Sequence, residues 1–295
     1  MRRSGKGHSA LAWFGAAIEI SLAAPAAHAA DTELTPLTAW NVDWANDSCV
    51  AQRAFGDARQ PMVFRMERYG PMDAFQLIIS GKQLRNLHHR DPMTVTYGRG
   101  GYAQRIRNIT VGSTPSGATT VFIPSSSVIA LPNGEEYTPW TGAISPQAEA
   151  AITEILLRYR AKTVVLKTGS LGRVFAEFRK CTDQLISAWG LDPAQQQTLQ
   201  RRPVPTTSPG TWLVSSDYPK EALTNGNQSI IAFRLMVGAD GKPTTCAVQH
   251  SYSGKLFDDV TCNALMRRAR FQPALDAEGK PVPSYFISKV RWMMG

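Results

Sequence analysis

Between residues 36 and 191, short runs of alternating apolar and polar residues dominate the chain. Gly, Pro and Ser turns separate these runs, which is the pattern of β-strands with one buried face. The predicted strands are residues 39–43, 49–55, 62–68, 75–80, 93–97, 104–111, 119–123 and 164–166. Two longer segments, 146–160 and 171–189, place apolar side chains at helical spacing. We therefore expect an α+β front domain over residues 31–191, rich in strands and carrying two helices.

The chain changes character twice after residue 191. Residues 192–211 are rich in Gln, Pro, Thr and Ser without apolar periodicity, which predicts a polar linker. Regular patterns then return in the order of a short helix, a hairpin, a helix and a strand. These elements are predicted at 218–223, 229–237 with 244–250, 254–270 and 282–292. The order predicts a second, small α+β domain over residues 212–295, in which a three-stranded antiparallel sheet packs on helices.

Composition narrows the class of protein. The 295 residues include 32 Lys and Arg against 23 Asp and Glu, giving a formal net charge of +9, and 43% are hydrophobic. These values are ordinary for a folded protein of about two domains. Because the cations are spread along the chain without a basic arm, we interpret the charge as a solvated surface and expect no nucleic-acid binding.

Residues 1–30 have the pattern of an export signal. Arg2, Arg3 and Lys6 precede a mostly apolar run over 10–27, and Ala27-His28-Ala29 has the small-residue spacing that signal peptidase recognises. We expect cleavage after Ala29 or Ala30. A carboxylate inside the apolar run, at Glu19, argues against a permanent membrane span. Two alternatives stay open: a retained membrane anchor and a buried helix.

The four cysteines agree with export. They form no C-x-x-C motif, which leaves no local pattern for a redox centre or a zinc ribbon. Four cysteines allow three pairings, and the division into domains favours one bridge in each, Cys49–Cys181 and Cys246–Cys262. Four reduced, buried thiols are the alternative.

The front domain contains no recognisable catalytic motif. His88-His89 are adjacent and have no further ligands at metal-binding spacing, so a solvated loop is favoured over a metal site. No Ser lies in a G-x-S-x-G or S-x-x-K pattern. We expect neither an enzyme nor a bound cofactor or metal. The alternative is a ligand-binding or enzymatic front domain, because its size is enough to enclose a pocket.

Three sequence features of the last eighty residues occur together in one family. They are Tyr218-Pro219, the turn Gly238-Ala-Asp-Gly-Lys-Pro243 and the segment Ala269-Arg-Phe-Gln-Pro-Ala274. In this order, over about residues 212–294, they resemble the C-terminal domain of the TonB energy-transducer family. The Cys246 and Cys262 pair looks like that of the disulfide-containing variety of these domains.

The resemblance implies a protein of the periplasm that binds an extended peptide as an added strand. In this family the peptide belongs to an outer-membrane transporter, and it pairs beside the last strand of the domain. By position, the residues implied here are Ser284, Tyr285, Phe286, Ile287, Ser288, Lys289, Val290, Arg291 and Trp292. An unpaired strand edge offers backbone groups to any extended chain, and Lys289 and Arg291 are expected to attract acidic partners. Pairing of the same edge in a homodimer is the alternative.

Two departures from the family favour an accessory role over that of the motor itself. Energy transducers keep an uncleaved anchor with a functional His in the span, whereas the apolar run here has no His. They also carry a long Pro-rich stretch, whereas the linker predicted here, residues 192–211, is a short segment that follows a folded domain. We therefore expect a soluble periplasmic protein that binds an envelope partner. The alternative is a protein anchored in the inner membrane by a retained signal.

Overall fold

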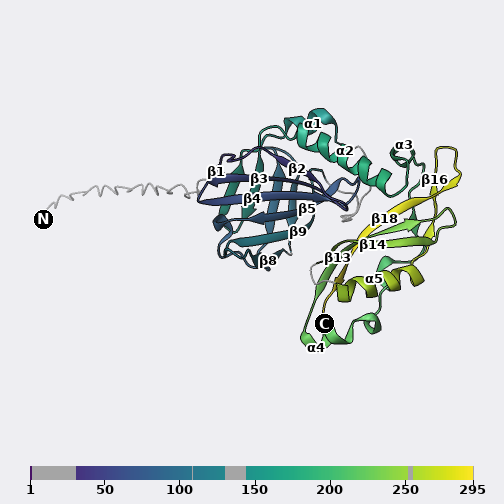
Figure 1. The fold of residues 1–295 in the computed structure, drawn as a ribbon. Helices are drawn as coiled ribbons and strands as arrows, with labels where there is room; N and C mark the ends of the chain where they lie inside the picture. Colours follow the sequence, from purple (N-terminus) through teal and green to yellow (C-terminus); the bar gives the residue numbers. More distant parts are fainter. Residues whose placement is uncertain (2–30, 108, 130–143, 252–254, 295) are drawn as a thin grey trace.

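The computed structural model describes residues 1, 31–107, 109–129, 144–251 and 255–294, which form two packed units (Figure 1). The signal or anchor predicted at 1–30 lies outside the described residues from residue 2 onward. We call residues 31–191 the front unit and 192–294 the C-terminal unit. Within the described part of the chain, no helix has the length and apolar character needed to cross a membrane.

Two sheets of the front unit share one hydrophobic core. The antiparallel six-stranded sheet has the order β2 (Asn41–Trp44), β3 (Cys49–Asp57), β4 (Gln60–Arg68), β5 (Ala74–Ser80), β9 (Thr119–Ser127) and β8 (Thr110–Ser113). The five-stranded sheet has the order β1 (Thr32–Leu34), β11 (Lys162–Leu166), β10 (Ile155–Tyr159), β6 (Met93–Tyr97) and β7 (Ala103–Ile106), and β1 pairs with β11 in parallel. Their inward side chains alternate along the strands, as sheet packing requires.

Helix α2 (Gly172–Ala188) closes this core. It buries Phe175, Phe178 and Leu185, which follow the predicted helical spacing, and the helix α1 (Pro146–Ala151) lies beside it (Figure 1). Residue Cys181 on the same face bonds to Cys49 at the start of β3, so the helix is covalently attached to the sheet.

One predicted helix of the front unit is wrong. The pattern over 146–160 predicts a single helix, but α1 ends at Ala151 and residues Ile155–Tyr159 form β10. Strand β10 lies between β11 and β6, and its first three residues are buried on both faces while Arg158 is exposed. A short apolar run of this kind cannot be distinguished from a helix by periodicity. The predicted strand at 104–111 is likewise two strands, β7 and β8, which belong to different sheets.

The C-terminal unit contains the expected three-stranded antiparallel sheet, with the order β14 (Pro243–Ser251), β13 (Ser229–Val237) and β18 (Ser284–Trp292). Helix α5 (Lys255–Arg268) packs on one face of this sheet, and α4 (Lys220–Asn225) precedes β13. Two short ribbons complete the unit: β12 (Val204–Pro205) with β15 (Phe271–Gln272), and β16 (Ala274–Leu275) with β17 (Pro281–Val282). The α+β class predicted for both units is confirmed.

The segment predicted as a linker carries secondary structure. Helix α3 (Pro193–Gln197) is capped by Asp192, whose side chain accepts a hydrogen bond from the Ala194 amide, and β12 follows the helix. The Gln196 side chain donates to the Pro283 carbonyl and accepts from the Ser284 hydroxyl, just where β18 begins. Residues 192–211 therefore pack on the rest of the C-terminal unit.

Both favoured disulfides are present. The Cys49–Cys181 bridge joins β3 to α2 and is almost fully buried, whereas Cys246–Cys262 joins β14 to α5 and is half-buried. No described cysteine is free.

Candidate partner-binding strand

Strand β18 is a regular nine-residue strand at the edge of its sheet. It pairs with β13 along its whole length, from Ser284 opposite Val237 to Trp292 opposite Ser229, without a register shift. Among the described strands, β13 is its only neighbour. In an antiparallel pair about half of the backbone N–H and C=O groups of an edge strand point away from the neighbour. This outer row could pair with an extended chain.

The opposite edge of the sheet is less regular. Strand β14 pairs with β13 across two register shifts, one beside Phe233 and one beside Val237. Such bulges twist a strand and interrupt its row of backbone groups. Strand β18 has no bulge and no internal proline, since Pro283 precedes its first residue. Of the two edges, β18 is the better template for an added strand.

One face of β18 packs on α5 and the aromatic residues around it. The Phe286 ring lies 5.1 Å from that of Phe271 and 5.8 Å from that of Trp212. At the end of the strand, the Trp292 indole donates a 2.9 Å hydrogen bond to the buried Thr261 hydroxyl of α5. These contacts fix the strand to the core of its own unit.

The other face of β18 packs on the front unit. Tyr285 stacks edge-on against Trp189, just after α2, with 5.1 Å between ring centres. Ile287 lies over Gly70, so closely that a Cβ atom on this glycine would be 2.6 Å from its terminal methyl. The Lys289 ammonium group donates to the Gln76 side chain at 3.1 Å and to the Pro124 carbonyl at 2.7 Å. Three alternate residues of the strand thus anchor it to the front unit.

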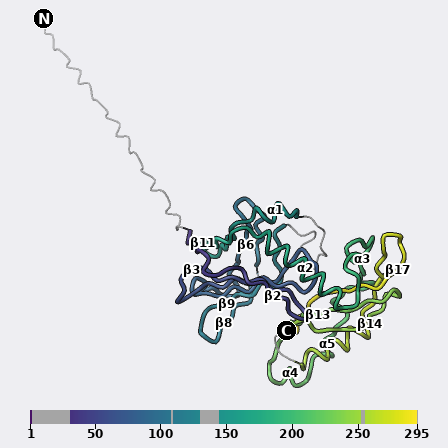
Figure 2. The backbone as a smooth tube through the Cα atoms, turned by 45° about the horizontal axis from the view of Figure 1, so that its top comes forward, coloured from purple at the N-terminus to yellow at the C-terminus, as the bar shows by residue number. Residues whose placement is uncertain are grey.

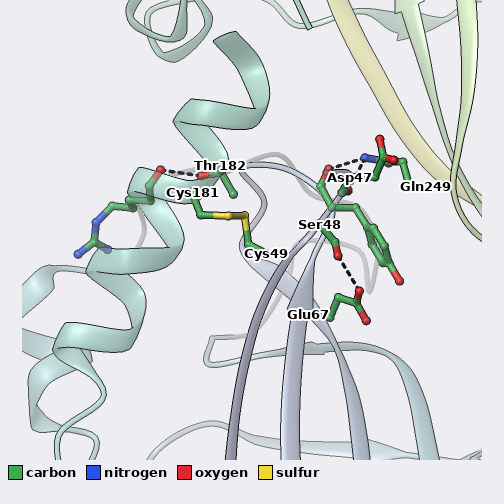
Figure 3. The surroundings of a disulfide bond; sticks show 9 residues. Asp47, Ser48, Cys49, Glu67, Cys181, Thr182 and Gln249 are labelled. Carbon is green, nitrogen blue, oxygen red and sulfur yellow. Dashed lines mark hydrogen bonds between the residues drawn. A yellow bond between two sulfur atoms is a disulfide. The ribbon is translucent and has the colours of Figure 1, made fainter. Parts of the chain in front are cut away.

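Neighbouring strands extend this interface. The Arg234 guanidinium of β13 lies 4.2 Å from the centre of the Trp189 ring and 3.7 Å from the Asp47 carboxylate. Burial lowers the pKa of Arg234, and the charge of Asp47 partly opposes this shift. From β14, the Gln249 amide donates to the Asp47 and Tyr69 carbonyls at 3.1 and 2.9 Å (Figure 3). The sheet is therefore a middle layer between α5 and the front unit.

A buried carboxylate of the front unit lies beside the interface. Glu67 of β4 is 4% exposed and accepts a 2.8 Å hydrogen bond from the Ser48 hydroxyl, next to the buried disulfide (Figure 3). The amide of Gln76 donates to Glu67 at 3.5 Å, while its oxygen accepts from Lys289. Gln76 therefore connects the carboxylate of one unit with the ammonium group of the other. Arg65 lies 3.4 Å from Glu67, so this carboxylate is not buried without a cation.

The structure assigns different surroundings to the nine predicted residues. Phe286, Val290 and Trp292 contact the core around α5, while Tyr285, Ile287 and Lys289 face the front unit. Lys289 was expected to attract an acidic partner, but in the structure its ammonium group donates hydrogen bonds to the front unit. Arg291 is the one exposed cation of the strand.

Sequence reasoning missed the interface, although a sign of it was present. The run Tyr285-Phe286-Ile287 is apolar at three successive positions, and successive side chains of a strand point to opposite faces. A strand with a single buried face would alternate instead. The apolar run therefore indicates a second covered face, but not what covers it.

The described residues show no group of His, Cys, Asp and Glu side chains that could hold a metal ion. His88 and His89 are exposed, and the His88 backbone amide donates to the Asp91 carboxylate in a tight turn. This placement agrees with the loop favoured by the sequence.

One comparison with known proteins gave a match. Residues 214–294 match the family model described as Gram-negative bacterial TonB protein C-terminal. This range contains β13, β14, α5 and β18, so the C-terminal unit carries a TonB C-terminal domain, as its sequence resemblance predicted. The match does not extend to the front unit, and neither a curated protein nor a solved structure matches the chain.

Proposed function

We propose that this protein captures an extended peptide of an envelope partner as a fourth strand beside β18. The observation that carries the proposal is the regular, unbulged pairing of β18, which leaves one row of backbone groups at the edge of the sheet. Main-chain hydrogen bonds supply affinity in this mode of recognition, and side-chain contacts supply specificity.

The family supports the class of partner. The C-terminal domain is that of a TonB protein, so the peptide is proposed to come from an outer-membrane transporter, with the protein working in the periplasm in support of transport. The role is that of a binding protein and not of an enzyme. Arg291, exposed at the edge, favours peptides with acidic residues.

The fixed position of β18 is consistent with this role. Aromatic contacts hold one of its faces to α5, and Tyr285, Ile287 and Lys289 hold the other to the front unit. A strand that is held in this way loses little conformational entropy when a peptide binds, which favours affinity.

The test is a titration of the isotope-labelled protein with transporter-derived peptides, followed by amide NMR. We expect saturable shifts in Ser284–Trp292 with a Kd below about 1 mM, and smaller shifts in β14. A peptide N-methylated at alternate residues keeps its side chains but lacks the donors of one edge, and we expect it not to bind. Equal binding of the methylated peptide, or shifts only outside β18, would contradict strand addition.

A charge reversal tests the acidic preference separately. Arg291→Glu is expected to weaken an acidic peptide by up to about fivefold, since an exposed ion pair contributes at most about 1 kcal/mol. Lys220→Glu, exposed at the start of α4, is the matched control and should leave the affinity unchanged. Sedimentation at increasing concentration distinguishes a homodimer that occupies the same edge, because added peptide would then dissociate it.

A further inference from the structure

A cleft of about 480 Å³ opens on the front unit. It lies between the turn that joins β3 to β4 and the turn that joins β8 to β9. Gln60 and Pro61, at the start of β4, line it, whereas the far end of β4 and the following Tyr69 meet the C-terminal unit. The turns that line the cleft are therefore at the opposite end of the sheet from the C-terminal unit, as the course of β8 and β9 shows (Figure 2). Its volume is in the range of small-molecule sites.

Three cations from two segments line this cleft: Arg59 from the β3–β4 turn, and Lys82 and Arg85 from the 3-10 turn Lys82–Leu84 and its C-terminal end. Among the described residues, neither Arg59 nor Arg85 forms an ion pair. Lys82 lies 3.9 Å from Asp57, a contact between two largely exposed side chains. The lining itself contains no carboxylate, and Asp57 pairs only with Lys82, which leaves an excess of positive charge.

The rest of the lining suits a polyol. The Thr114 and Ser116 hydroxyls lie 2.9 Å apart in the β8–β9 turn, and Ser80, whose hydroxyl lies 2.8 Å from that of Thr120, adds a third hydroxyl to the lining. Each hydroxyl can donate and accept, so this rim can bind the hydroxyl groups of a sugar. Pro61, Val63 and Ala118 add apolar surface, against which the C–H face of a sugar ring could pack.

We propose that this cleft binds a phosphate-bearing sugar or polyol, with Arg59 and Arg85 on the phosphate and the hydroxyl rim on the ring. A guanidinium group can donate two parallel hydrogen bonds to a phosphate. The two guanidinium groups together with the Lys82 ammonium group balance the charge of a phosphate dianion. A free sugar phosphate and the headgroup of an anionic phospholipid share this chemistry. The site is independent of strand capture at β18, and it gives the front unit a ligand of its own.

The test uses isothermal titration of the full chain with glucose 6-phosphate, and with glucose as the neutral match. We expect binding of glucose 6-phosphate and none of glucose. Vesicles of phosphatidylcholine, with and without phosphatidylglycerol, form a second arm of the test. If the protein sediments with the phosphatidylglycerol vesicles and does not bind glucose 6-phosphate, the ligand of the cleft is a lipid headgroup. If neither probe binds up to about 10 mM, an affinity too weak for a specific site, the proposal is overturned.

A charge-matched pair of variants separates the cleft from general attraction. Arg59→Gln with Arg85→Gln should lower the affinity for the probe that binds by about tenfold or more, because two charge-assisted contacts are lost. Arg105→Gln with Arg173→Gln removes the same charge from exposed positions that do not line the cleft. An equal loss in both double variants would show a diffuse electrostatic effect and overturn the site. Unchanged melting temperatures confirm that both variants are folded.

Discussion

The single residue His250, in the interface between the two units, makes the stability of the protein depend on pH. It lies on β14, half-buried, with its ring centre 6.4 Å from that of Tyr69 in the front unit. Burial lowers the pKa of His250 below its usual value of 6.5; Lys289 and Arg65 lower it further, and Glu67 opposes them. The folded protein therefore binds a proton at His250 less readily than the unfolded chain does.

The sign of the pH effect follows from this difference. The contribution of His250 to the free energy of unfolding is complete above pH 6.5 and is lost as the pH falls toward the lowered pKa of the folded state. We expect urea unfolding to show lower stability at pH 5.5 than at pH 7.5, and His250→Gln to reduce this difference. His89→Gln removes an exposed histidine and should keep it. The same pH dependence in both variants would place the titrating group elsewhere.

At the scale of elements, the two disulfides close loops of very different length. Cys49–Cys181 spans a sequence separation of 132 residues, and Cys246–Cys262 spans 16. In the chain-entropy account the long loop contributes about 5 kcal/mol and the short one about 3 kcal/mol. The long bridge also holds α2, and with it Trp189, against the sheet that forms the interface.

Double substitutions test whether the long-loop disulfide stabilises the protein more than the short-loop disulfide. Replacing both Cys49 and Cys181 by Ala should lower the free energy of unfolding by about 2 kcal/mol more than replacing both Cys246 and Cys262 does. Urea unfolding of the two double variants, with circular dichroism as the probe, gives the comparison. If the short bridge proved more important, local strain or packing and not loop entropy would dominate.

Sequence patterns predicted most elements because each depends on its own residues. Strand β13 and helix α2 have clear periods of two and 3.6 residues, and the structure has both. The pattern failed at Ile155–Tyr159, where neighbours on both sides and not the local sequence decide the conformation. For β18 the residue pattern indicated the strand and the sheet, which the structure has; the family resemblance implied that its edge binds a partner, and this remains a prediction.

At the scale of the whole molecule, the arrangement of the two units could not be read from the sequence. Gln76 and Lys289 are 213 positions apart, and Asp47 and Gln249 are 202 apart, so no local period relates them. The charged contacts of the interface are also short-range and specific. Their geometry depends on both units being folded. The sequence therefore predicted no contacts between the units for polar residues such as Gln76 and Arg234.

The close contact at Gly70 allows the interface itself to be tested. Leucine at this position would force its Cβ against Ile287, and the Trp189 ring would lie only 3.4 Å from the same Cβ. Overpacking of this kind costs about 1–3 kcal/mol, and here separation of the units relieves it. We expect the wild-type chain to unfold in one transition and Gly70→Leu in two, with a larger radius of gyration by small-angle X-ray scattering. Gly112→Leu is the control, because a Cβ on this exposed β8 glycine meets nothing within 4 Å. A radius of gyration equal in both variants would mean that contacts other than Gly70 with Ile287 hold the two units together.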